Sequence, residues 1–154
     1  MFSFKPLHLL IADDDQEDKD IFTVAVREVS PSIILESAKS CEALIDKLEN
    51  SNTLPDIIFL DLNMPKMGGH TCLQKLKQSG RYSQIPVIIY TTSSAREDIE
   101  RTFMNGAAYF LTKPVDIAEL KEALRYLLQN SFKETNRGLE NYVLEHSPFS
   151  NISS

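Results

Sequence analysis

The sequence predicts an α/β fold in which a parallel sheet carries helices on both faces. Short apolar runs alternate with longer stretches whose apolar residues recur at helical spacing. Such alternation is typical of a doubly wound parallel sheet with right-handed crossovers. Several of the apolar runs end directly in a polar side chain and a turn signal. The length of 154 residues suits one domain with a single hydrophobic core.

The first half of the chain contains three predicted strands, each followed by a predicted helix. The strands cover residues 7–12, 32–38 and 57–60, and the helices cover about 16–29, 41–50 and 69–79. In the first helix, a shared face is formed by Ile21, Phe22, Ala25 and Val29, and we expect it to pack on the sheet. The uninterrupted apolar run at 57–60 fits a strand covered on both faces.

Two more strands and two more helices are predicted in the second half. The strands cover residues 86–90 and 107–111, and the helices begin near Ser94 and Asp116. Both starting points read as capping boxes, because a glutamate follows three residues later. Gly106 indicates the end of the fourth helix, and the fifth ends near residue 130. The expected sheet therefore has five strands.

Composition excludes several classes of function. The net charge of −6 provides no basic surface for nucleic acid. No apolar run approaches the roughly 20 residues that a membrane helix needs, and the N-terminus does not resemble a signal peptide. Cys41 and Cys72 are isolated and form no CxxC motif, which suits a reducing compartment and argues against a disulfide framework. We therefore expect a cytoplasmic protein.

Polar side chains follow four of the predicted strands. Asp13 and Asp14 follow the first, Asp61 the third, Thr91 the fourth and Lys113 the fifth. Because ligands of parallel sheets bind outside the carboxyl ends of the strands, we expect these side chains to meet. Clustered carboxylates require a cation, and oxygen ligands suit Mg²⁺. A carboxylate nucleophile, a metal, a lysine and a hydroxyl together predict a phosphoryl-transfer site.

Residues 7–130 resemble the receiver domains of two-component response regulators. The resemblance rests on four motifs: Asp13-Asp14, Asp61 within Leu-Asp-Leu-Asn-Met-Pro, Thr91, and Lys113-Pro114. It implies a flavodoxin-like sheet with the strand order 2-1-3-4-5. It also implies that Asp61 is the phosphoacceptor, forming an aspartyl phosphate, and that Lys113 contacts a phosphoryl oxygen. The bond between Lys113 and Pro114 is then expected to be cis.

The same resemblance implies a metal site and a conformational switch. Asp14, Asp61 and the backbone carbonyl of Asn63 would bind Mg²⁺ directly, and Asp13 would act mainly through a bound water. Thr91 and Phe110 would form the switch pair, with the hydroxyl turning toward the phosphoryl group and the ring moving inward. The face made by the fourth helix, fifth strand and fifth helix would then meet partners or form a homodimer.

The leading hypothesis is a stand-alone phosphorelay protein. Residues 1–130 would form the receiver, and residues 131–154 a partly helical, then disordered tail without an output domain. The phosphoryl donor would be a sensor histidine kinase or a histidine phosphotransfer protein, and the output a contact with a downstream protein. Neither nucleic acid nor membrane would be a partner, and the chain would catalyse only its own phosphorylation and dephosphorylation.

Two other hypotheses remain. A Mg²⁺-dependent phosphohydrolase would place a second aspartate two residues after the nucleophile, where this chain has Asn63. A phosphorylation-independent adaptor would keep the fold without needing the complete set of reactive side chains. Outside the site, we expect Asp15 to cap its helix, Asp18 to be solvated and His70 to be exposed and inert. The spacing of Leu139, Tyr142 and Val143 predicts a short amphipathic turn docked on the domain's own surface.

Overall fold

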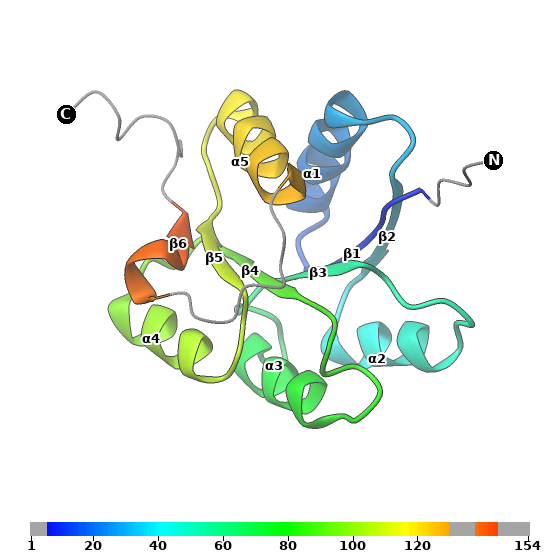
Figure 1. The fold of residues 1–154 in the computed structure, drawn as a ribbon, viewed down its shortest axis with the longest axis vertical. Helices are drawn as coiled ribbons and strands as arrows, with labels where there is room; N and C mark the ends of the chain where they lie inside the picture. The colour runs from blue at the N-terminus through cyan, green and yellow to red at the C-terminus, as the bar shows by residue number, and fades with distance from the viewer. Residues whose placement is uncertain (1–5, 130–137, 145–154) are drawn as a thin grey trace.

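The structure is a computed structural model and describes residues 6–129 and 138–144. These residues form a parallel sheet with the strand order β2-β1-β3-β4-β5-β6 (Figure 1). The strands are β1 His8–Ala12, β2 Ile34–Ala38, β3 Ile57–Leu60, β4 Val87–Thr91, β5 Tyr109–Thr112 and β6 Val143–Leu144. The order of the first five strands confirms the predicted fold class, and β6 is an addition to it.

Five helices cover the two faces of the sheet. On one face lie α1 (Gln16–Val29) and α5 (Ile117–Gln129); on the other lie α2 (Cys41–Glu49), α3 (Gly69–Gln78) and α4 (Arg96–Met104) (Figure 1). The helix α1 follows the predicted bounds, but the face that it buries is rotated relative to the predicted one. Phe22, Ala25 and Val26 are fully buried, whereas Ile21 is 42% exposed. Residues 22, 25 and 26 lie at helical spacing on one face, and position 21 is rotated off it.

Two of the three predicted helix caps are confirmed. The Asp15 carboxylate accepts a hydrogen bond from the backbone N–H of Asp18 at 3.0 Å, and the Asp116 carboxylate accepts from that of Ala118 at 2.8 Å. The capping box at Ser94 is wrong, because α4 is preceded by Ala95, which provides no side-chain cap. The Ser93 hydroxyl accepts instead from the N–H of Ala95 at 3.2 Å.

The sixth strand comes from the region expected to be a tail. After the 3₁₀ helix η1 (Leu139–Asn141), β6 pairs in parallel with β5, so that Val143 lies opposite Phe110. The prediction that this segment docks on its own domain is confirmed, whereas the five-stranded count is wrong. A strand at the edge of a sheet leaves backbone N–H and C=O groups without partners, and β6 supplies partners for part of β5. The predicted disorder after residue 146 lies outside the described residues.

Two further expectations are corrected. Cys41 and Cys72 form a disulfide with their Cα atoms 5.8 Å apart. Both residues are buried on the same side of the sheet, where α2 and α3 bring together cysteines that are 31 positions apart. The described residues contain no cis peptide bond, so the bond before Pro114 is trans, the form that X–Pro bonds favour by about 0.5–1 kcal/mol. No helix within 6–129 or 138–144 has the length and apolar character of a membrane span.

Candidate functional site

The register of the sheet brings the predicted site residues to one edge. Ala12 of β1 pairs with Leu60 of β3, so Asp13 and Asp61 leave neighbouring strands at the same level. The N–H of Asp61 donates to the carbonyl of Ala12 at 3.0 Å, which fixes this arrangement. Thr91 at the end of β4 pairs with Thr112 at the end of β5, and Lys113 follows directly. The predicted meeting of these side chains at the carboxyl edge is therefore observed.

The loop after Asp61 is held close to α3 by a glycine. The N–H of Gly69 donates to the carbonyl of Leu62 at 3.1 Å. A Cβ atom at position 69 would lie 2.6 Å from the Cα of Leu62 and would also collide with the Asp61 carbonyl. Lys66 in the same loop has a φ of 64°, which non-glycine residues rarely adopt. The aspartate therefore stands on a tight turn with little freedom to shift.

Three carboxylates gather at the carboxyl edge. Asp13, Asp14 and Asp61 each offer an oxygen, and these atoms lie within 4.8 Å of one another. Asp13 and Asp61 are buried, whereas Asp14 is exposed and faces solvent. An all-oxygen set with one solvent-facing member suits Mg²⁺, which keeps several waters in protein sites. The residues present therefore fit the metal that the sequence predicts.

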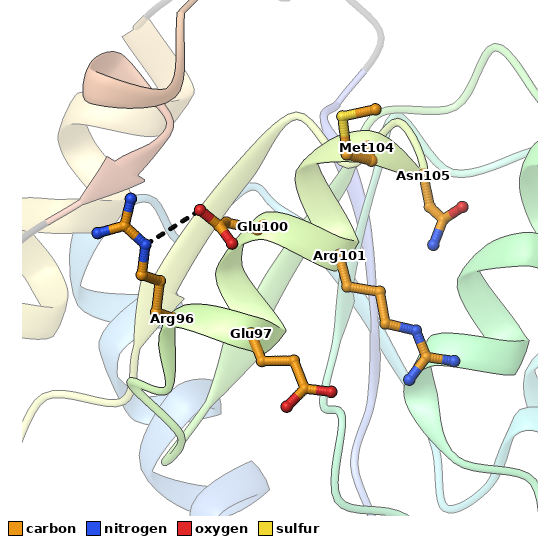
Figure 2. A pocket seen from close by; sticks show the side chains of 6 residues that line it. All are labelled: Arg96, Glu97, Glu100, Arg101, Met104 and Asn105. Carbon is orange, nitrogen blue, oxygen red and sulfur yellow. Dashed lines mark hydrogen bonds and ion pairs between the residues drawn. The ribbon is translucent and has the colours of Figure 1, made fainter.

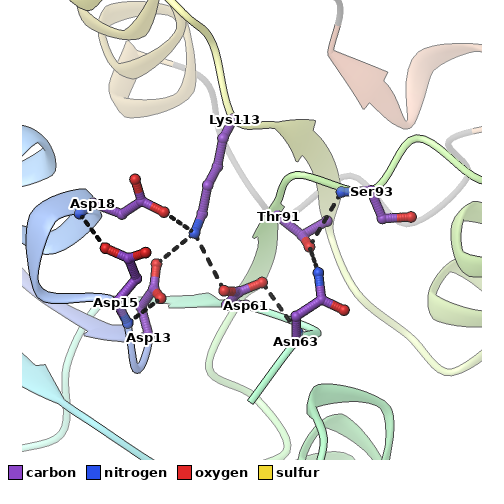
Figure 3. Close-up of polar contacts among 8 residues, drawn as sticks. All are labelled: Asp13, Asp15, Asp18, Asp61, Asn63, Thr91, Ser93 and Lys113. Carbon is purple, nitrogen blue, oxygen red and sulfur yellow. Dashed lines mark hydrogen bonds and ion pairs between the residues drawn. The ribbon is translucent and has the colours of Figure 1, made fainter.

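Lys113 binds two of these carboxylates, Asp13 and Asp61, together with that of Asp18 (Figure 3). Its ammonium donates to Asp13 at 2.8 Å, to Asp18 at 2.7 Å and to Asp61 at 3.2 Å. The side chain is 7% exposed, and the ammonium lies 5.4 Å from the centre of the Tyr90 ring. A lysine ammonium has three hydrogens, so all three are used by carboxylates in this arrangement. A phosphoryl oxygen that binds Lys113 must therefore displace one of these partners.

Asp18 is the site residue that the sequence analysis missed. It was expected to be solvated, but its carboxylate, 30% exposed, pairs with Lys113 across 95 positions of sequence. The acidic first turn of α1 explains its presence there, since carboxylates at a helix N-terminus are favoured by the helix dipole. Its contact with Lys113 forms because the first turn of α1 lies beside the residue that follows β5.

Burial changes the pKa values of charged side chains at the carboxyl edge. It raises the pKa of Asp13 to about 6, although the hydrogen bonds from Lys113 and from the N–H of Asp15 oppose this effect. Burial alone would lower the pKa of Lys113, but the hydrogen bonds to Asp13 and Asp18 and the charge of Asp61 raise it above its usual value. Lys113 is therefore protonated, and its single positive charge is shared by several carboxylates. A divalent ion would add the positive charge that such a cluster favours.

Thr91 lies on the other side of Asp61 and is fully buried. Its oxygen accepts from the Asn63 side-chain amide at 3.3 Å and from the N–H of Ser93 at 3.5 Å (Figure 3). The N–H of Asn63 in turn donates to Asp61 at 3.2 Å. Both contacts use the Thr91 oxygen as an acceptor, so its hydroxyl hydrogen can be offered to an incoming phosphoryl oxygen.

The expectation for His70 is wrong. Its Nε2 lies 2.8 Å from a carboxylate oxygen of Asp98, and its side chain is only 16% exposed. The other Asp98 oxygen accepts from the Ser93 hydroxyl at 2.6 Å. This Ser93 bond, together with His70, lowers the pKa of Asp98. The start of α3, the loop after β4 and α4 are therefore joined by polar contacts that begin beside Thr91.

A separate hollow of about 520 Å³ lies on the outer surface of α4 (Figure 2). It is lined by Arg96, Glu97, Glu100, Arg101, Met104 and Asn105. Arg96 and Glu100 form an ion pair of 3.0 Å at its side, and the former is 84% exposed. None of the carboxyl-edge side chains lines this hollow, so the chemistry predicted for Asp61 does not take place there.

Comparison with known proteins agrees with this geometry. The family model described as "Response regulator receiver domain" matches residues 9–125. The two-component response regulator ORR13 of Oryza sativa subsp. japonica is 30% identical over 78% of this chain and 97% of its own length. The DNA-binding dual master transcriptional regulator RpaA of Synechocystis is 30% identical over 91% of this chain but only 56% of its own length.

A solved structure gives the same result at the level of the fold. The response regulator in red light signaling of R. palustris is 28% identical to this chain and superimposes with a TM-score of 0.74. The alignment covers 84% of this chain and 96% of that protein. The chain therefore matches ORR13 in sequence, and the R. palustris protein in sequence and architecture, over nearly the whole length of each.

Proposed function

The chain belongs to the response regulator receiver domain family of two-component phosphorelays, and on this premise we propose that Asp61 is its phosphoacceptor. The main support for the proposal is that Lys113 donates hydrogen bonds to both Asp13 and Asp61, which follow separate strands. A cation beside a buried aspartate supports phosphoryl transfer, because this chemistry depends mainly on positioning and charge stabilisation.

In the proposed reaction an oxygen of Asp61 attacks the phosphorus of a phosphohistidine donor. The phosphorus–nitrogen bond breaks, and the histidine leaves with its electron pair as an aspartyl phosphate forms. Lys113 exchanges one carboxylate partner for a phosphoryl oxygen, and Thr91 donates its hydroxyl hydrogen to another. These groups counter the charge on the phosphoryl oxygens, as preorganised donors do in other phosphoryl-transfer sites.

We assign Mg²⁺ to the carboxylates of Asp13, Asp14 and Asp61, with the backbone carbonyl of Asn63 as a further ligand. The closeness of the three carboxylates and the exposure of one of them support this assignment. When bound, the ion would supply positive charge to the phosphoryl oxygens and reduce the repulsion among the acids. Asp13, which already accepts from Lys113 and from the N–H of Asp15, would act mainly through water.

The switch is proposed to run from Thr91 to Phe110. When the hydroxyl turns toward the phosphoryl group, it leaves its contacts with Asn63 and Ser93. The Phe110 ring is already fully buried in this structure, so the space released beside β4 would let it shift further toward Thr91, and the surface of α4 and β5 would change with it. Such a local electrostatic change coupled to a packed two-state element is a general signalling device.

We further propose that residues 1–130 act as the receiver and that residues 131–154 form its C-terminal tail. The donor would be a histidine kinase or a histidine phosphotransfer protein, and the receiver would signal by contact with a protein or a second copy. RpaA is described as DNA-binding, but the match covers only 56% of its length, and the net charge of −6 disfavours a nucleic-acid surface here.

The test is phosphorylation by acetyl phosphate, followed by intact-mass spectrometry. We expect wild type to gain one phosphoryl group in the presence of Mg²⁺ and none after chelation. Asp61→Asn, which keeps the size of the side chain, is expected to gain none under either condition. Uptake by Asp61→Asn equal to that of wild type would overturn the assignment. A folded wild type that fails with acetyl phosphate and with a phosphorylated histidine phosphotransfer protein would favour the adaptor hypothesis.

A further inference from the structure

A buried tyrosine fixes the C-terminal segment, residues 138–144, to the domain. Tyr142 is 1% exposed, and its ring lies 5.2 Å from that of Phe103 on α4 and 6.2 Å from that of Phe110 on β5. Tyr142 fills the space between α4 and the edge of β5, and we call the surface that it covers there, formed by Thr102, Phe103 and Phe110, the α4–β5 groove. Aromatic pairs at these separations stabilise a contact beyond the effect of the area that they bury.

The backbone of the segment adds a strand to the sheet. The N–H of Phe110 donates to the carbonyl of Tyr142 at 3.0 Å, and Leu144 lies opposite Leu111. Leu144 is buried, with 7% of its surface exposed. Strand addition with alternate side chains entering pockets is a recurring mode of peptide recognition. The groove therefore has the two parts that this mode requires, a sheet edge and an anchor pocket.

The floor of the groove contains a polar group with a defined preference. Thr102 of α4 is fully buried and donates its only hydroxyl hydrogen to the carbonyls of Asp98 and Ile99. The Tyr142 hydroxyl lies 2.6 Å from the Thr102 oxygen and must be the donor in that bond. Burial also raises the pKa of Tyr142, so its hydroxyl stays protonated. The groove is thus suited to tyrosine rather than to phenylalanine.

The segment is small enough to leave the groove. It comprises a 3₁₀ helix of 3 residues and a strand of 2, and it follows α5 after the eight positions 130–137. A short covalent connection gives a segment an effective concentration on the order of millimolar. For the segment to be docked in most molecules, its Kd for the groove as a free peptide needs to be only about 0.1 mM. A competing peptide can match that affinity.

We infer that the α4–β5 groove is a docking site for an extended peptide with a tyrosine anchor. In this chain residues 138–144 occupy it in cis, and the partner is a protein segment that adds a strand parallel to β5. That segment would place a tyrosine hydroxyl on Thr102 in the groove and an aliphatic side chain beside Leu111 on the opposite face of the sheet. The control of this exchange by phosphorylation rests on the proposed function, but the existence of the peptide site does not.

The site is tested with a capped synthetic peptide of sequence 138–144 and unphosphorylated Tyr142→Ala, in which the cis segment has lost its anchor. Isothermal titration or NMR is expected to give a Kd of about 0.1 mM or tighter. Wild type, whose own segment competes, should bind the peptide at least about tenfold more weakly. The same peptide with phenylalanine in place of tyrosine should bind more weakly than the original.

Two outcomes would overturn the inference. One is a folded Tyr142→Ala, judged by circular dichroism and cooperative melting, that binds no peptide up to about 1 mM. The other is equal binding by wild type and variant, which would place the peptide elsewhere. If Tyr142→Ala does not fold, Tyr142→Phe takes its place, because it loses only the hydroxyl. It should bind the peptide more tightly than wild type does, and failure to do so counts against the groove. Because no phosphoryl donor is used, these results are independent of the role of Asp61.

Discussion

The carboxyl edge and the α4–β5 groove share strand β5 but depend on different forces. At the carboxyl edge, Lys113 directly after β5 is held by three carboxylates at 2.7–3.2 Å. In the groove, the Phe110 ring packs against that of Tyr142 and its N–H donates to the Tyr142 carbonyl, while the Tyr142 hydroxyl pairs with that of the buried Thr102. The first region is arranged to receive charge, and the second to release or accept a peptide.

This contrast suggests how one strand can connect chemistry to recognition. Charge interactions at the carboxyl edge are strong and directional, so a new phosphoryl group must displace existing partners. Packing in the groove is short-range and depends on shape, so a small movement of Phe110 alters the fit of Tyr142.

The largest effect is expected from Lys113→Ala. It leaves Asp13 and Asp61 buried without their cation, and breaking a buried ion pair in this way costs about 3–5 kcal/mol. We expect denaturant unfolding to show this loss and added Mg²⁺ to restore part of it. Lys121→Ala is the control, because its partner Glu28 is half exposed and the pair is worth about 0–1 kcal/mol. A Lys113→Ala variant as stable as the control would refute the account of the carboxyl edge.

Gly69→Ala should have the next largest effect. The new methyl group would collide with the backbone of Asp61 and Leu62, and overpacking of this kind costs about 1–3 kcal/mol. We also expect slower phosphorylation by acetyl phosphate, because the loop that carries Asp61 must shift. Gly80→Ala is the matched control, since nothing lies within 4 Å of the added atom. Equal stability and equal rates in the two variants would show that the turn is not tight.

A smaller effect is expected in the groove. Tyr142→Phe and Thr102→Val each remove one partner of the buried hydroxyl pair, and a hydrogen bond of this type contributes about 0.5–1.5 kcal/mol. In a double-mutant cycle, the two changes should be less than additive in free energy of unfolding. Strict additivity would mean that the hydroxyl contact does not stabilise the docked segment.

The smallest effect is expected from Asp18→Asn. This carboxylate is partly exposed, and its loss frees one Lys113 hydrogen for a phosphoryl oxygen. We expect phosphorylation by acetyl phosphate to become a few-fold faster, with stability changed by no more than about 1 kcal/mol. Asp20→Asn serves as the control, because Asp20 contacts the Gln16 side chain at 2.8 Å on the exposed face of α1. A slower Asp18→Asn would assign Asp18 to the support of Lys113 instead of competition for it.

Much of the carboxyl edge was predictable from the sequence. Residues such as Asp61 and Thr91 end apolar runs, and the geometry of parallel sheets places such positions together. Asp18 was missed because its partner Lys113 lies 95 positions away, and an acidic first turn explains an aspartate without any partner. His70 was missed for the same reason, since Asp98 meets it only when α3 and α4 pack side by side.

The groove was less predictable because its signals are short. A strand of 2 residues has no measurable periodicity, so β6 could not be distinguished from a turn. The spacing of Leu139 and Tyr142 did indicate docking, but not the place. The disulfide between Cys41 and Cys72 escaped for a related reason, because distance along the chain says little about distance in a doubly wound fold.

The link between the two regions is tested most directly by hydrogen exchange with and without acetyl phosphate and Mg²⁺. If Phe110 moves inward on phosphorylation, Tyr142 loses part of its packing, so the amides of Phe110 and of residues 142–144 should exchange faster in phosphorylated wild type. Asp61→Asn treated in the same way should show no change. Unchanged exchange at these amides in a protein whose mass confirms phosphorylation would contradict the proposal that β5 carries the signal to the groove.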